Sequence, residues 1–260
     1  MYKSDIANKT ISNFLEYHKK LPISNWEIDR WDSEWISYFM YHDNKPYFQD
    51  YHNFSIDKKF LEDLPNIQEE EMIHRKISPE FYETHLWVKG TDLINKNILE
   101  IGCGTGLIGK QLGLVVNNYL GLDYSPLALR IAKLISPDKC HYHHLSEADK
   151  MISYLETIDT MIGRNFFIHQ NFETTNWLLK FAHFFLKKDG IVSADFYEPN
   201  PELQQGSLHP AKSPFTDQPS CGFIYKENEL FELAQECGYK IENITFRAEI
   251  QRQFVRFVKI

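Results

Sequence analysis

Residues 98–106 read Ile-Leu-Glu-Ile-Gly-Cys-Gly-Thr-Gly, a short apolar run followed by glycines on alternate positions. The apolar run predicts a buried strand over 97–101, and the periodicity beyond it predicts a helix over 107–114. Glycine adopts positive φ and carries no Cβ, so the backbone between them can turn sharply and approach a ligand closely. We therefore expect a ligand at the carboxyl end of this strand, beside the start of the following helix.

A second apolar strand is predicted over 118–123, and it ends in Asp123. Asp123 follows Gly102 at about the 20-residue spacing at which an acid hydrogen-bonds ribose hydroxyls in nucleotide-binding α/β domains. The alternative is a turn or helix-capping aspartate. That role is less needed here because Ser125 and Pro126 already form a well-marked helix start. Glycines, strand context and acid together predict a ligand whose ribose hydroxyls are bound by Asp123.

Strands and helices continue to alternate along the rest of the chain, which predicts a parallel sheet covered by helices on both faces. The last two strands are expected to form a hairpin, so the final strand runs antiparallel to the others. Gly238 is expected to end the last helix in a left-handed conformation. The predicted helices are 6–17, 33–40, 55–64, 79–88, 125–135, 174–186 and 227–237, and the further strands are 141–145, 157–163, 190–196, 240–249 and 254–259.

Composition and charge exclude some classes of function. The 260 residues are 43% hydrophobic and 25% charged, which is ordinary for a globular protein. A net charge of -8 argues against a nucleic-acid partner. No apolar run approaches the about 20 residues of a membrane span, and the N-terminus does not resemble a secretory signal. We expect a cytoplasmic protein with reduced thiols, because the four cysteines are far apart and form no CxxC pair.

Aromatic residues make up 15% of the chain and are concentrated before residue 90. The sequence pattern changes near Lys89 and Gly90, where aromatic, turn-rich sequence gives way to alternating strand and helix patterns. We therefore divide the chain into an N-terminal helical lid and acceptor-binding segment at 1–89 and a main domain at 90–260. Aromatic walls bury organic molecules well. The alternative is that these rings only seal helices onto the sheet.

The sequence resembles the class I S-adenosylmethionine (SAM)-dependent methyltransferases, in particular the branch that acts on small molecules. The resemblance lies in residues 98–106, 119–125, 158–170, 186–196 and 229–239. It implies an α/β fold with a Rossmann-like, seven-stranded, mostly parallel sheet whose last strand is antiparallel, together with the aromatic-rich helical N-terminal lid. It also implies SAM as the cofactor.

The resemblance further implies which residues hold the cofactor. Glu100 would organise the turn, the glycine segment would contact the methionine part, and Asp123 would hold the ribose. Ser146 and Glu147 stand where the family has an Asp near the adenine, which is a departure from its pattern. The residues expected to bind the cofactor are Glu100, Gly102, Cys103, Gly104, Gly106, Asp123, Tyr124, Ser146, Glu147 and Asn165.

Two residues are candidates for the chemistry, His169 and Tyr197, which follow the fourth and end the fifth strand of the domain. By resemblance, a His at the first position serves some family members as a base; the alternative is a histidine packed at a helix start. Tyr197, with Glu198, could bind the acceptor or simply open the next loop. The loop 200–221, with His209 and Phe215, is a second candidate wall.

His141, His143 and His144 are close in sequence, but strand alternation separates them between two faces and no acid lies at a suitable spacing. We predict no metal site. The leading hypothesis is methyl transfer from SAM to nitrogen or oxygen of a small organic metabolite. The alternatives are methylation of a peptide or protein side chain, and a non-catalytic SAM-binding module.

Overall fold

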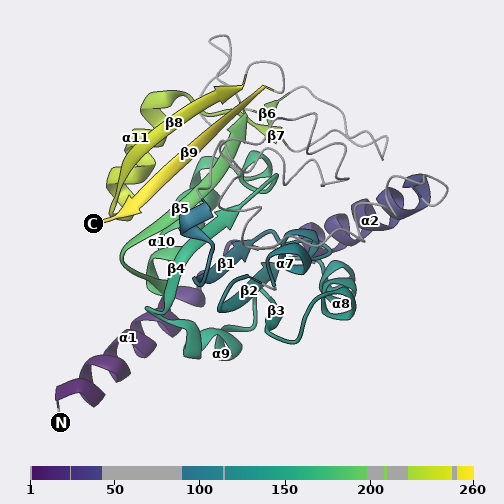
Figure 1. Ribbon diagram of the computed structural model, residues 1–260. Coiled ribbons are helices and arrows are strands. Elements are labelled where there is room, and N and C mark those ends of the chain that lie inside the picture. Colours follow the sequence, from purple (N-terminus) through teal and green to yellow (C-terminus); the bar gives the residue numbers. More distant parts are fainter. Residues whose placement is uncertain are drawn as a thin grey trace.

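The computed structural model describes residues 2–23, 25–42, 90–113, 115–197, 208–209, 222–247 and 251–260. Within them, seven strands form one sheet in the order β3-β2-β1-β4-β5-β9-β8 (Figure 1). The strands are β1 (Asn97–Ile101), β2 (Asn118–Asp123), β3 (Cys140–His144), β4 (Ile158–Gly163), β5 (Leu186–Tyr197), β8 (Tyr239–Arg247) and β9 (Arg252–Lys259). A small second sheet pairs β6 (Leu208–His209) with β7 (Gly222–Phe223).

Strands β1 to β5 run parallel, and β9 pairs antiparallel with both β5 and β8. This confirms the predicted Rossmann-like, seven-stranded, mostly parallel sheet with an antiparallel last strand. The parallel strands all end at one edge of the sheet, here called the carboxyl edge. Because β9 runs the other way and Arg252 pairs with Tyr197, the start of β9 lies at the carboxyl edge too.

The helices cover both faces of the sheet. Alternate residues of β1 face opposite layers: Leu99 and Ile101 join the core that contains α10 and α11, and Ile98 joins the core that contains α7 and α8. The helical elements are α1 (Tyr2–His18), α2 (Asn25–His42), η3 (Gly90–Asp92), α7 (Leu107–Leu112), α8 (Pro126–Ile135), α9 (Ala148–Met151), η4 (Ile152–Tyr154), η5 (Phe167–His169), α10 (Phe172–Phe185) and α11 (Glu227–Cys237).

Two predicted helix ends are confirmed in detail. The hydroxyl of Ser125 accepts the backbone N–H of Ala128 at 3.0 Å, and Pro126 is the first residue of α8. Gly238 ends α11 with a φ of 77° and donates its N–H to carbonyls of the last turn. The start of α8 and the end of α11 could be predicted because serine, proline and glycine favour these positions in helices.

Other predicted boundaries were wrong, and a local hydrogen bond explains one of them. α10 begins at Phe172 and not at 174, because the side chain of Asn171 accepts the N–H of Thr174 at 2.8 Å. α2 begins at Asn25 and not at 33. Ser33 lies inside this helix and donates its hydroxyl to the carbonyl of Asp29 at 2.8 Å. Leu186, predicted as the end of a helix, pairs with Ile158 in the sheet.

Other elements also differ from the prediction in one of their bounds. α7 ends at Leu112, two residues early, and α1 begins at Tyr2. β3 and β8 each begin one residue earlier than predicted. The β6–β7 pair was not predicted. The predicted helices 55–64 and 79–88 lie outside the described residues.

α1 is fixed to the sheet layers by its last turn. Tyr17 donates its hydroxyl to the carbonyl of Trp177 at 3.0 Å, and the two rings stack with centroids 5.3 Å apart. His18 hydrogen-bonds the carbonyl of Leu145 at 2.7 Å through Nε2. Among the described helices, none combines the length and apolarity that a membrane span requires.

Candidate functional site

The glycine turn between β1 and α7 has the backbone conformation that its sequence predicts. Gly102, Gly104 and Gly106 have φ values of 78°, 49° and 77°. The N–H groups of Gly102 and Cys103 both donate to the carbonyl of Leu122, at 2.8 and 3.1 Å, which holds the turn against the end of β2. A Cβ on Gly102 would lie 2.3 Å from the ring of Phe166. Position 102 therefore requires glycine, because any side chain there would overlap the ring of Phe166.

Asp123 connects the glycine turn to the start of α8. Its Oδ2 accepts the N–H of Gly104 at 2.8 Å, and its Oδ1 accepts the N–H of Ser125 at 2.8 Å. The carboxylate is buried, and burial raises its pKa, while the hydrogen bonds from Ser125 and Gly104 oppose that rise. Asp123 therefore has the turn-stabilising role that was the alternative interpretation of the sequence. The backbone N–H of Tyr124 also donates to this carboxylate. The carboxylate still has capacity for a further donor, because its two oxygens accept about four hydrogen bonds in all.

Helix α2 lies over this turn, beside α8 (Figure 1). A Cβ on Gly104 would lie 2.5 Å from the indole of Trp35, so that ring rests on the turn. Asp32 accepts hydrogen bonds from the hydroxyl of Ser125 and, at 3.2 Å, from the N–H of Leu127. The carboxylate therefore binds the first turn of α8, where the helix dipole favours negative charge.

Trp35→Ala should loosen α2, because the indole is the contact between this helix and the glycine turn. We expect the backbone amides of residues 28–36 to exchange hydrogen faster in the variant than in the wild type. Mass spectrometry of peptic peptides measures this. Ile36→Ala, at a neighbouring position whose side chain is 49% exposed, should leave exchange unchanged. Equal exchange in the wild type and Trp35→Ala would contradict the contact.

The turn after β3 contributes the next group of candidate residues. His144 hydrogen-bonds the carbonyl of Tyr124 at 2.8 Å through Nε2 and the hydroxyl of Ser146 at 2.6 Å through Nδ1. Glu147 accepts the N–H of His144 at 3.0 Å. Ser146 and Glu147 are exposed, whereas Tyr124 is buried with its ring 5.6 Å from that of Phe166. His144, one of the three histidines predicted not to bind metal, therefore organises the turn after β3.

A polar cluster lies where β4 and β5 end and β9 begins; we call it the edge cluster, and it comprises Arg164, Asn165, Asp195, Tyr197 and Arg252. Of these, Arg164 and Asp195 are buried, and Asn165 is exposed. Asp195 Oδ2 accepts from Arg164 at 2.6 Å and from Arg252 Nε at 3.2 Å, and Oδ1 accepts the N–H of Asn165 at 2.7 Å. The guanidinium of Arg252 lies 4.0 Å from the ring centroid of Tyr197. Asn165 has a positive φ of 57° and its side chain accepts from Arg164.

His169 ends the short helix η5 and meets α2. Its ring packs edge-on against Trp31, with centroids 4.9 Å apart. Both residues are partly exposed. The structure thus places His169 against α2, where Trp31 lies, whereas Tyr197 lies at the end of β5 beside Arg252.

Glu100 and Cys103 are buried beneath the turn, with 2% and 6% of their surfaces exposed. Burial raises the pKa of the Cys103 thiol well above its usual value, so the thiol is neutral at physiological pH. Cys103 therefore serves as a small packing residue. Within the described residues, no three His, Cys, Asp or Glu side chains gather in a metal-binding arrangement.

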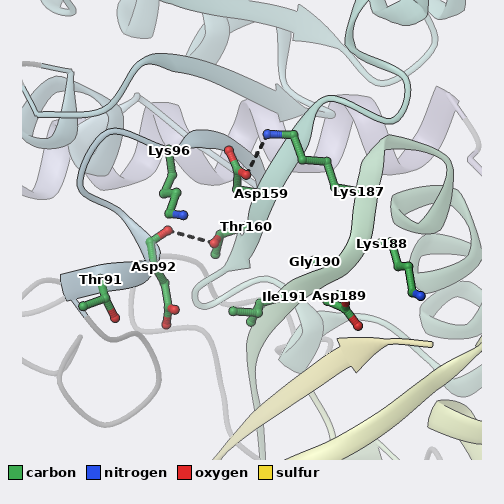
Figure 2. A pocket seen from close by; sticks show the side chains of 10 residues that line it. All are labelled: Thr91, Asp92, Lys96, Asp159, Thr160, Lys187, Lys188, Asp189, Gly190 and Ile191. Carbon is green, nitrogen blue, oxygen red and sulfur yellow. Dashed lines mark hydrogen bonds and ion pairs between the residues drawn. The ribbon is translucent and has the colours of Figure 1, made fainter.

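A separate pocket of about 140 Å³ lies at the opposite edge of the sheet (Figure 2). Two of its polar groups are already used: Lys187 pairs with Asp159 at 2.7 Å, and Thr160 donates to the carbonyl of Asp92 at 2.8 Å. The glycine turn and the edge cluster are both at the carboxyl edge. The pocket in Figure 2 is therefore distinct from the candidate site.

Sequence reasoning missed Asp32, Asp195 and Arg252. An acid in the buried run of β5 was a signal for Asp195, since a buried carboxylate needs donors. Asp32 and Arg252 gave none, because their partners are distant in the chain. Glu198, Phe215 and most of the loop 200–221 lie outside the described residues; His209 is described as part of β6 only.

Comparisons with known proteins point to one fold. A SAM-dependent methyltransferase from Methanosarcina mazei superimposes with a TM-score of 0.51 at 18% identity, covering 64% of this chain and 93% of that one. A putative one from Listeria monocytogenes gives a TM-score of 0.50 at 13% identity, covering 65% and 92%. These likenesses concern the fold.

In sequence, a 68-residue stretch is 37% identical to a ubiquinone biosynthesis O-methyltransferase from Hydrogenovibrio crunogenus. That stretch is 25% of this chain and spans only 28% of the relative. No model of a known protein family matches the chain.

Proposed function

We propose that this chain, which has the fold of the class I SAM-dependent methyltransferases, transfers a methyl group from SAM to nitrogen or oxygen of a small organic metabolite. The observation that carries the proposal is the glycine turn: three positive-φ glycines whose middle amide is bound by a carboxylate at the end of the neighbouring strand. The local likeness to an O-methyltransferase supports the same reading.

Two properties of the glycine turn, its open backbone and its charge, suit SAM as the ligand. Gly104 presents a backbone without a Cβ, so a ligand can approach it where the Trp35 ring lies now. The carboxylates of Asp123 and Glu100 at this turn suit a ligand with an ammonium and a sulfonium, whereas a pyrophosphate would be repelled. When bound, SAM supplies a methyl group already activated by positive sulfur.

The chain's own residues have separable roles in this proposal. Asp123 accepts ribose hydroxyls with the lone pairs that Gly104 and Ser125 leave available. The segment Gly102–Gly106 lies against the methionine part, with Glu100 and Cys103 supporting it from below. Tyr124, Ser146, Glu147 and Asn165 surround the remaining surface of the cofactor.

The protein's contribution to the chemistry is alignment and exclusion of water, because methyl transfer from a sulfonium is an in-line displacement. In this proposal His169 accepts a proton from an acceptor that enters beneath α2, and Tyr197 orients that acceptor. Residues 1–89 form the lid and acceptor-binding segment in this proposal, with 90–260 as the SAM-binding domain. Trp31 on His169 and Trp35 on Gly104 are the contacts that favour this division.

Asp123→Ala should weaken SAM binding roughly ten- to a hundredfold, because it removes hydrogen bonds to a charged acceptor worth about 1.5–3 kcal/mol. Isothermal titration calorimetry measures the dissociation constant. Asp138→Ala, an exposed acid in the α8–β3 turn, should bind as the wild type does. Unchanged affinity in a folded Asp123→Ala variant would remove the ribose assignment.

The catalytic part of the proposal is tested by turnover. The wild-type protein is incubated with SAM and with amine, phenol and carboxylate libraries, and release of S-adenosylhomocysteine (SAH) is measured. Turnover of a small acceptor supports the proposal. Turnover of peptides alone identifies a protein methyltransferase, and SAM binding without turnover of any acceptor identifies a non-catalytic binding module.

A further inference from the structure

Helix α2 contacts two residues that donate hydrogen bonds to the carboxylate of Asp123. These donors are the N–H groups of Gly104 and Ser125, each at 2.8 Å from a carboxylate oxygen. The indole of Trp35 lies on Gly104, and the side chain of Asp32 accepts the hydroxyl of Ser125. The helix is therefore docked directly on the residues that surround the carboxylate proposed to bind the ribose.

The indole of Trp35 fills the space that the missing side chain of Gly104 leaves. A Cβ on Gly104 would lie 2.5 Å from Cζ2 of the indole and 2.9 Å from its Cη2. Carbon atoms that are not bonded approach one another to only about 3.5 Å. A ligand atom in contact with this side of Gly104 would therefore overlap the ring. The indole and such a ligand exclude each other.

Asp32 and Trp35 contribute different contacts from one face of α2, since they are three residues apart on the helix. Asp32 accepts the N–H of Leu127 at 3.2 Å in addition to the hydroxyl of Ser125, and so holds α2 on the start of α8. These bonds do not involve the indole. A change in the rotamer of Trp35 can therefore free Gly104 while Asp32 keeps the helix on α8.

We propose that Trp35 is an internal competitor of the cofactor: its indole occupies the binding side of Gly104, and Asp32 holds α2 where the indole does so. This inference rests on the proposed function. The apparent affinity of a site is its intrinsic affinity multiplied by the fraction of molecules in which the site is open. The docked indole lowers that fraction, so Trp35 weakens cofactor binding. A lid residue that packs on the bound cofactor would strengthen binding instead.

The experiment measures SAH binding to the full chain by isothermal titration calorimetry, for the wild type and for Trp35→Ala. Removal of the indole opens the glycine turn, so the variant should bind SAH roughly fivefold or more tightly than the wild type. Ile36→Ala truncates an apolar side chain of the same helix that is 49% exposed, and should bind SAH as the wild type does. Circular dichroism and thermal unfolding establish that each variant is folded.

Asp32 gives a second test, through kinetics. Asp32→Ala removes the bonds to Ser125 and Leu127, so α2 should leave the turn more often. SAH should then associate about threefold or more faster than with the wild type, as measured by surface plasmon resonance on the immobilised protein. Asp29→Ala removes the same charge from an exposed position of α2 and should leave the association rate unchanged.

The sign of the change in affinity decides the inference. Equal or weaker SAH binding by Trp35→Ala would overturn it, because the indole would then be neutral or part of the wall that holds the cofactor. An unchanged association rate in Asp32→Ala would overturn it as well. Either result, with SAH bound, leaves the proposed function standing. Absence of SAH binding to both the wild type and Trp35→Ala would refute the proposed function itself.

Discussion

Asp195→Ala is expected to lower the free energy of unfolding by about 3–5 kcal/mol, because it leaves two largely buried guanidinium groups without their shared carboxylate. Asp195 is 1% exposed, and Arg164 and Arg252 both donate to its Oδ2. The substitution also leaves the N–H of Asn165 without its acceptor. Urea denaturation followed by circular dichroism gives the value.

Two comparisons sharpen this experiment. Asp195→Asn keeps the shape and an acceptor oxygen but loses the charge, so it should lose less stability than Asp195→Ala. Glu16→Ala removes the fully exposed partner of Lys19 and should produce no measurable change. A loss below about 1 kcal/mol in Asp195→Ala would show that water or local rearrangement replaces the carboxylate.

Gly102→Ala is expected to abolish measurable SAH binding and to destabilise the fold. The residue has a φ of 78°, and its Cβ would lie 2.3 Å from the ring of Phe166. The left-handed conformation costs about 1–2 kcal/mol for a residue with a Cβ, and overpacking adds about 1–3 kcal/mol. Displacement of Phe166 or of the turn disrupts the hydrogen bonds from Gly102 and Cys103 to Leu122, which hold the turn against the end of β2. Calorimetry with SAH and thermal unfolding measure the two effects.

Gly238→Ala separates backbone strain from damage to the site. Gly238 has nearly the same φ, 77°, but its Cβ would meet His183 at an easier 3.2 Å, at the end of α11. That variant should lose about 1–2 kcal/mol from the conformation alone and keep wild-type affinity for SAH. If both variants bind SAH normally, the glycine turn is not the cofactor site.

The central part of the fold could be predicted from local signals. The apolar runs at β1 and β2, the glycines after β1 and the Ser125–Pro126 pair each determine structure within a few residues of themselves. The parallel arrangement of β1 to β5 follows from the alternation of strands and helices, because a helix between two strands returns the chain to the same edge of the sheet. For these reasons the sheet, the turn and the start of α8 agree with prediction.

Contacts between distant segments could not be predicted in the same way. Asp32 binds the first turn of α8, and Arg252 shares Asp195 with Arg164, across gaps that no periodicity spans. Strand ends were also uncertain: Leu186 has the same apolar character in a helix end as in a strand. The roles of the candidate site residues remain predictions that binding and turnover measurements must test.

The position of α2 has a consequence for kinetics. With Trp35 on Gly104 and Asp32 bound to the start of α8, a ligand cannot reach that side of the glycine turn until these contacts separate. Entry and departure of the ligand are then gated by the same event, so its residence time depends on how often the helix lifts. Under the proposed function, binding of SAM and release of the spent cofactor would both require α2 to separate from the turn.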